Sequence, residues 1–218
     1  MRKNLFIALV CLAPLLAQSQ SNVPGRFSLS TGFDVGVHGV VSELTYQGTL
    51  SDQDTTGAGT KQFTFNAHYG IAKWFSAGLG FKNGYYLESV EENKSKQNKI
   101  GQFYVDTRFY FLNKDKINLY AGFSLGATKL DVHRETNYGL FIITEDYQLS
   151  SGYSRFQFGL NWWIGNKVGF WMNMEGNKHN FKLNSFSLNG DAQNLDDWDF
   201  TMRTAGFQTS FGVCIKFK

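Results

Sequence analysis

Eight segments of the chain alternate between apolar and polar residues. In the first segment Phe27, Leu29 and Phe33 fall on one side, and Ser28 and Asp34 on the other. A period of two residues indicates a β-strand whose two faces meet different surroundings. The sequence therefore predicts an all-β protein with eight strands, at positions 27–38, 62–69, 75–82, 103–111, 119–128, 155–162, 168–175 and 207–217.

The connections between these strands alternate in length. Short connections fall at 71–73, 113–116 and 165–167, and long ones at 39–61, 88–99, 131–148 and 177–198. In an antiparallel up-and-down sheet the short turns lie at one end and the long loops at the other. This layout is typical of outer-membrane barrels, which have short periplasmic turns and long external loops. It predicts an eight-stranded antiparallel transmembrane β-barrel with both ends of the barrel domain on the periplasmic side.

The two faces differ enough to orient the barrel. The apolar face is rich in Phe and carries no charge, whereas the other face holds mainly Gly, Ser, Asn, Tyr and a few charged residues. An eight-stranded barrel has a narrow interior, so it cannot hold the many Phe rings. We expect the rings to face lipid. The alternative is a secreted soluble barrel with its apolar face inside.

The amino-terminal residues have the pattern of a secretory signal. Arg2 and Lys3 precede the apolar stretch 5–17, and the small residues Ala17 and Ser19 suit a cleavage site. We therefore predict a cleaved signal peptide at 1–19 and a single barrel domain at 20–218. The stretch 5–17 is the only long apolar run, and it is too short for a membrane-spanning helix, which needs about 20 apolar residues.

Composition excludes several further classes. The 218 residues are 17% aromatic but only 18% charged, and the mean hydropathy of −0.29 is too low for a bundle of membrane helices. Without Arg2 and Lys3, the basic residues nearly balance the 18 acidic ones, and no basic stripe suggests nucleic-acid binding. Cleavage would leave only Cys214, so no intrachain disulfide is expected.

Seven charged residues fall on the inward face of the predicted strands. Buried charges are tolerated when they are paired and hydrogen-bonded. We therefore predict a near-neutral network that fills the lumen together with inward Tyr rings; a gated ion path is the sharper alternative. The seven residues are Asp34, Lys82, Asp106, Arg108, Arg155, Glu175 and Lys216.

Large aromatic residues gather near the short turns. Trp and Tyr are enriched at membrane interfaces, where they form girdles around a barrel. The sequence predicts a periplasmic-side aromatic girdle made of Trp74, Trp162, Trp163, Trp171 and Phe217.

The long connections are the expected functional end. The third carries Tyr138, Leu140, Phe141 and Ile142, which favour a β-ribbon above the membrane. The fourth contains an Asn-Gly turn signal at 189–190 and is followed by Trp198. We predict that these apolar residues offer a contact surface to a protein, a glycan or lipopolysaccharide, although a plain hairpin with a polar tip is the simpler interpretation.

No residue pattern indicates catalysis. His38, His68, His133 and His179 lie in no recognisable catalytic spacing, and the sequence has neither a Gly-x-Ser-x-Gly nor a His-Glu-x-x-His motif. We therefore predict no enzyme activity, no catalytic residue, no metal site and no cofactor. A lipid-modifying enzyme assembled only by converging loops is a less favoured alternative.

Two stretches carry a resemblance to a known family. The turn region 69–80 (YGIAKWFSAGLG) and the closing 211–217 (FGVCIKF), behind a signal peptide, resemble the small outer-membrane β-barrel family of Bacteroidota. More distantly, the chain is similar to OmpX-type and OmpA-type barrels. The resemblance covers 26–218 and implies an integral outer-membrane protein. Such barrels commonly end on an aromatic residue, whereas here Lys218 follows Phe217.

Together these features predict a barrel with a plugged polar interior that acts through its external loops or outer wall. It would be a structural, adhesive or accessory subunit in contact with outer-membrane lipid and lipopolysaccharide. A larger outer-membrane protein complex is a further candidate partner. A channel for small solutes or hydrophobic ligands is the alternative.

Overall fold

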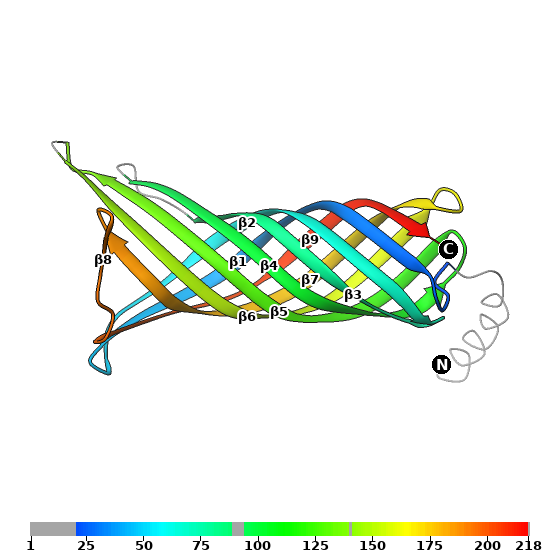
Figure 1. Ribbon diagram of the computed structural model, residues 1–218, viewed down its shortest axis with the longest axis horizontal. Coiled ribbons are helices and arrows are strands. Elements are labelled where there is room, and N and C mark those ends of the chain that lie inside the picture. Colours follow the sequence, from blue (N-terminus) through cyan, green and yellow to red (C-terminus); the bar gives the residue numbers. More distant parts are fainter. Residues whose placement is uncertain (1–20, 89–93, 140, 218) are drawn as a thin grey trace, which may run out of the picture.

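The computed structural model describes residues 21–88, 94–139 and 141–217, so the predicted signal peptide lies outside the described residues. Figure 1 shows a barrel whose strands are tilted relative to its axis. The long hairpins lie at one end and both described termini at the other. The strands are β1 (Phe27–Tyr46), β2 (Thr49–Ala72), β3 (Phe75–Glu88), β4 (Lys94–Asn113), β5 (Ile117–Asn137), β6 (Ile142–Trp163), β7 (Val168–Leu188), β8 (Asp191–Ala192) and β9 (Trp198–Phe217). None of the helices in the described ranges is both long and apolar enough to cross a membrane.

Eight of these strands close into a ring. Each long strand pairs antiparallel with its neighbours, and β1 pairs with β9 from Phe27↔Phe217 to Tyr46↔Trp198. The two-residue strand β8 pairs only with the end of β7, inside the fourth hairpin. A closed ring leaves no unpaired sheet edge in the membrane, where an unsatisfied backbone group would cost several kcal/mol. The predicted eight-stranded up-and-down barrel is confirmed.

The long connections are mostly strand rather than loop. The predicted loop 39–61 is a continuous extension of β1 and β2, turning only at Gln47 and Gly48, both with positive φ. The regions 131–148 and 177–198 likewise consist largely of paired strands, and the Asn189-Gly190 turn adopts the positive φ angles that its sequence indicates. The ribbon predicted for 131–148 is therefore present. In 39–61, which was predicted as a loop, strand pairing instead continues beyond the apolar band.

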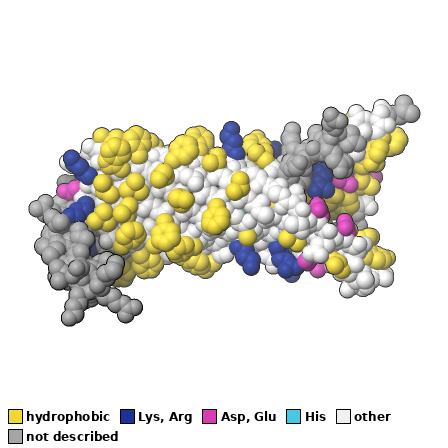
Figure 2. Space-filling model, turned by 180° about the vertical axis from the view of Figure 1, so that it is seen from behind, with side chains coloured by type: hydrophobic (Ala, Val, Ile, Leu, Met, Phe, Trp, Pro, Cys, Tyr) yellow, Lys and Arg dark blue, Asp and Glu magenta, His cyan; other side chains and the backbone are white. Residues whose placement is uncertain are grey.

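The two faces of the wall have the predicted orientation. Phe33, Phe103 and Phe158 lie on the outside, whereas Thr64 and Ser124 are completely buried inside. Figure 2 shows hydrophobic side chains over the part of the wall nearer the termini, then Lys and Arg, then Asp and Glu toward the hairpins. The exposed cations that follow the apolar band include Lys61, Lys99, Lys129, Lys178 and Arg203.

Inward glycines make room for the large inward rings. A Cβ on Gly80 would lie 2.0 Å from the ring of Tyr104, and a Cβ on Gly159 would lie 2.2 Å from the ring of Tyr120. Both rings are fully buried. The narrow lumen therefore alternates bare backbone with large aromatic groups, and it is filled across its width.

Candidate functional site

The segment that precedes β1 is hydrogen-bonded to the short turns at the periplasmic end of the barrel. The backbone N–H of Asn22 donates to Asn113 Oδ1 over 2.9 Å, and Asn113 Nδ2 donates back to the Asn22 carbonyl over 2.7 Å. Ser21 donates to Asn118 Oδ1, which also accepts from Trp163 Nε1 over 2.6 Å. A Cβ on Gly70 would lie 2.3 Å from the carbonyl oxygen of Val23. This segment is thus packed across the end of the barrel.

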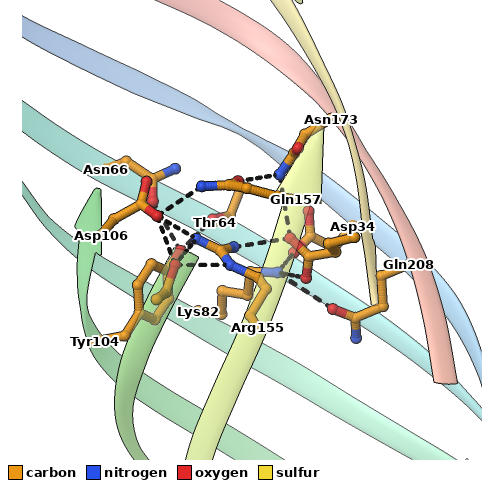
Figure 3. A network of polar contacts seen from close by, with 12 residues as sticks. Asp34, Thr64, Asn66, Lys82, Tyr104, Asp106, Arg155, Gln157, Asn173 and Gln208 are labelled. Atoms are coloured by element: carbon orange, nitrogen blue, oxygen red, sulfur yellow. Dashed lines mark hydrogen bonds and ion pairs between the residues drawn. The ribbon is translucent and has the colours of Figure 1, made fainter. Parts of the chain in front are cut away.

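A polar network fills the middle of the lumen, with Asp106 on β4 as one of its centres (Figure 3). The Asp106 carboxylate lies 2.7 Å from His68 Nε2, 3.1 Å from Arg108 Nε and 3.2 Å from Arg155 Nη2. Ser124 Oγ donates to the same carboxylate over 2.5 Å. These groups come from four strands, so the carboxylate connects the wall across the lumen.

Glu175 on β7 is the second centre of the network. Its carboxylate accepts from Arg155 Nη1 over 2.8 Å and from Lys82 Nζ. Lys82 Nζ also lies 2.5 Å from Asp34 Oδ2. Arg155 therefore links Glu175 to Asp106, and Lys82 links Glu175 to Asp34. The chain of ion pairs joins opposite parts of the ring in one connected layer (Figure 3).

Aromatic rings cover the two guanidinium groups of this layer. The Arg155 guanidinium lies 4.4 Å from the centre of the Tyr104 ring, and that of Arg108 lies 4.5 Å from the centre of the Tyr120 ring. Asp34, Lys82 and Asp106 each have 0% of their surface exposed. A lumen that carried a continuous column of water would wet these groups. The network therefore fills the lumen at this level.

The structure brings six of the seven predicted network residues together and leaves Lys216 apart. The six comprise three carboxylates and three cations, so the layer is formally neutral. Lys216 lies nearer the periplasmic end, with its Nζ 4.2 Å from the centre of the Trp163 ring, and it makes no ion pair with the carboxylates of the described ranges. Alternation placed Lys216 on the correct face, but it does not give a residue's height in the barrel.

The predicted girdle is divided between the two faces. Trp74, Trp162 and Phe217 point outward and are 60%, 55% and 42% exposed. Trp163 and Trp171 are only 5% and 3% exposed and pack with Cys214 inside the barrel, so placing them in the lipid-facing girdle was wrong. Trp162 and Trp163 are consecutive, and consecutive residues of a strand face opposite sides. Nearness to a turn alone does not identify a girdle residue.

An apolar cluster, which was not predicted from the sequence, occupies the lumen above the charged layer. Its members are Val40, Ala58, Tyr86, Ile100, Leu130, Val132, Leu149, Phe181 and Met202. In this region the outward positions are polar, such as Lys129 and Arg203. The wall has thus reversed its polarity where it leaves the apolar band. The signal lies in the sequence, because the alternation continues through 129–132 with apolar residues on the opposite parity.

The predicted contact residues lie at two separate places on the extracellular rim. Tyr138 and Phe141 stack at the tip of the β5–β6 hairpin, with ring centres 5.4 Å apart, and Ile142 beside them is also exposed. Trp198 instead packs at a tilt against Tyr46, with ring centres 4.6 Å apart, where β1 meets β9. Leu140 lies outside the described residues. The hairpin tip and the Trp198 region are two surfaces rather than one.

His133 lies on the same hairpin, outside the membrane-spanning part. Its Nδ1 is 2.6 Å from Asp146 Oδ1 and its Nε2 is 3.2 Å from Glu135 Oε1. Hydrogen bonds from Asp146 and then Glu135 raise the pKa of His133 above its ordinary value. Within the described ranges no group of three or more His, Cys, Asp or Glu side chains is arranged to hold a metal ion.

No protein-family model matches the sequence. No curated protein matches it either. Solved structures do match in fold. OprG from Pseudomonas aeruginosa superposes with a TM-score of 0.57 at 14% identity, covering 91% of this chain and 99% of OprG. The outer-membrane protein AlkL, solved in lipid bilayers, superposes with a TM-score of 0.52 at 15% identity, covering 93% of this chain and 94% of AlkL. The chain therefore has the fold of the small outer-membrane β-barrel proteins.

Proposed function

We propose that the protein is an integral outer-membrane barrel with a closed lumen that acts through its extracellular hairpins as an adhesive, structural or accessory subunit. The observation that carries this proposal is the exposed apolar tip of the β5–β6 hairpin. Phe141 is 60% exposed, and it stacks with Tyr138 far above the lipid-facing band. Exposed aromatic residues outside the bilayer are suited to a protein partner, because burying such rings stabilises association.

The wall supports contact with lipopolysaccharide as well. Figure 2 shows Lys and Arg side chains just beyond the apolar band, where lipid headgroups would lie. Lys61, Lys129 and Lys178 are exposed. Lys ammonium groups attract phosphate groups as point charges. Contact with outer-membrane lipid and lipopolysaccharide is part of the proposal, and so is membership of the small barrel family of Bacteroidota, which rests on the turn region 69–80.

The filled lumen disfavours the channel alternative. The Asp106 and Glu175 ion pairs lie inside the lumen, where both carboxylates are almost completely buried. We expect no steady conductance when the purified protein is placed in planar lipid bilayers. A large and reproducible single-channel current would contradict the closed lumen. The protein is also proposed to have no enzyme activity, since the exposed His133 faces two carboxylates but no nucleophile among its contacts.

Co-purification with matched hairpin variants tests the docking role. The variant Tyr138→Ser/Phe141→Ser removes the apolar tip, and Leu50→Ser removes an equally exposed apolar residue from the β1–β2 hairpin. After mild detergent extraction from native membranes, the wild type and Leu50→Ser should each retain a stoichiometric partner that the tip variant loses. Recovery of the wild-type barrel alone, or full retention by the tip variant, would contradict the proposal.

A further inference from the structure

The extracellular end of the barrel encloses a cavity that the docking role does not use. The cavity, here called the vestibule, has a volume of about 550 Å³. Its wall consists of inward residues of β1, β2, β5, β6, β7 and β9, with the segment 193–195 at one side. Leu44, Leu149, Leu183, Phe200 and Met202 supply much of the apolar lining.

The vestibule has a closed floor. Leu149 and Met202 belong both to its lining and to the buried apolar cluster, against which Leu183 and Phe200 also pack. Below that cluster lies the charged layer around Glu175. A molecule entering from outside would therefore stop in the vestibule. The arrangement is a cup rather than the entrance of a channel.

The walls of the cup are held in place by ring stacking. Tyr147 and Phe186 stack across β6 and β7 with ring centres 4.8 Å apart. Leu44, Leu183 and Phe200 are only partly buried, so apolar surface faces the open space. A concave, mostly apolar space of this volume with a few polar groups is typical of a site for a small molecule. An eight-stranded barrel is also wide enough to hold one small ligand.

The charged residues of the lining favour a cationic group. Asp52 and Asp54 on β2 both line the vestibule, and neither carboxylate forms an ion pair with the described side chains. Among the described lining residues one cation is present, Arg134, and it lies over an aromatic ring. Its guanidinium lies 5.4 Å from the centre of the Tyr147 ring, and Glu145 is its register partner on β6. The two unpaired carboxylates are thus available to a positively charged ligand.

We propose that the vestibule binds a small amphiphile whose apolar body fills the cup and whose cationic head pairs with Asp52 and Asp54. The apolar lining would bury the body, at about 0.8 kcal/mol for each buried methylene. The two lining carboxylates would select the head. This site is independent of the hairpin tip, because Tyr138 and Phe141 do not line the vestibule.

Three probes with one chain length and different heads test this proposal. Octylamine, octanol and octanoate would be titrated by calorimetry into the full-length protein in lipid nanodiscs, with empty nanodiscs as the blank for partitioning into lipid. Octylamine should bind roughly tenfold more tightly than octanol, which corresponds to two partly exposed ion pairs, and octanoate should bind most weakly. No binding above the empty nanodiscs, or a preference for octanoate, would overturn the proposal.

Variants separate the body of the ligand from its head. Asp52→Asn/Asp54→Asn should bring octylamine to the affinity of octanol. Leu44→Trp/Leu183→Trp should weaken all three probes by about tenfold, as expected if the indoles displace two methylene groups. If the double variant does not fold, the single variants Leu44→Trp and Leu183→Trp are used for the same titration. Leu50→Trp, near the turn of the β1–β2 hairpin and outside the vestibule lining, should bind like the wild type. Unchanged binding in the folded Trp variants would overturn the site.

The same titration distinguishes this inference from the docking role. Tyr138→Ser/Phe141→Ser should bind octylamine normally even though we expect it to lose its membrane partner. Loss of amphiphile binding in that variant would place the ligand on the hairpin tip and overturn the vestibule site. Failure of co-purification with intact octylamine binding would overturn the docking role alone.

Discussion

The charged layer makes a quantitative prediction about stability. Replacing Glu175 by Gln keeps the size and shape of the side chain but removes its charge. In the native protein this carboxylate contacts both Lys82 and Arg155. After the substitution the layer would hold three cations against two carboxylates, in a region where these side chains are almost completely buried.

The expected loss of unfolding free energy depends on the carboxylate partners that Lys82 and Arg155 retain. Removing one partner of a buried ion pair destabilises a protein by about 3–5 kcal/mol, because it leaves an uncompensated charge. Here Lys82 retains Asp34 at 2.5 Å, and Arg155 retains Asp106 at 3.2 Å. Neither cation is left without a partner. We therefore expect Glu175→Gln to cost about 3 kcal/mol, at the lower end of that range.

Urea unfolding in lipid vesicles, followed by Trp fluorescence, measures this free energy. The double variant Lys82→Met/Glu175→Gln restores two carboxylates against two cations, so its cost should fall below the sum of the single costs by about 2 kcal/mol. Asp131→Asn is the matched control. It breaks an exposed pair with Lys129 at 3.0 Å and should cost no more than about 1 kcal/mol. A Glu175→Gln cost equal to that control, together with additive single costs, would refute a network of coupled charges.

Other regions of the barrel give further expected outcomes. Because Asp146 and Glu135 raise the pKa of His133, the contribution of protonated His133 is complete below pH 6.5 and is lost as the pH rises through the raised pKa. Amide exchange in the β5–β6 hairpin, corrected for intrinsic rates, should show that step, and His133→Asn should abolish it. Gly80→Ala should lower the urea midpoint because its Cβ meets the Tyr104 ring at 2.0 Å, whereas Gly101→Ala, with open space, should leave it unchanged. Unheated and boiled samples should migrate differently in detergent gels, and identical mobility would count against a closed barrel.

The alternation of residues was enough to predict the ring and the orientation of its faces. Each predicted strand lies within a strand of the structure, and Asp34, Lys82 and Glu175 point inward as their parity indicates. Parity is a local property, since successive side chains of a strand face opposite sides. Which inward charges meet is a different question. It depends on the register between strands, such as Arg155↔Asn177, and a single sequence does not contain that register in readable form.

Two predictions were wrong, the girdle assignment of two Trp residues and the loop at 39–61. Trp163 and Trp171 were assigned to the girdle from their distance to a turn, but their parity places them inside. The predicted loops were inferred from the end of the apolar alternation at positions such as Val37. In fact the alternation changes sign beyond that point, because the outside surroundings change from lipid to water while the backbone continues to pair.

This change of sign also explains why a barrel with a polar lumen carries an apolar cup. Within the bilayer the wall needs apolar residues outside, so the inward positions are left to groups such as Asp106 that satisfy one another. Above the bilayer water covers the outside, and the hydrophobic effect then favours apolar residues such as Leu149 and Phe181 inside. Filled completely, that upper interior would simply be the core of a soluble barrel. The open vestibule between Leu44 and Leu183 is what the need for a stable core does not account for, and it is the reason to look for a ligand there.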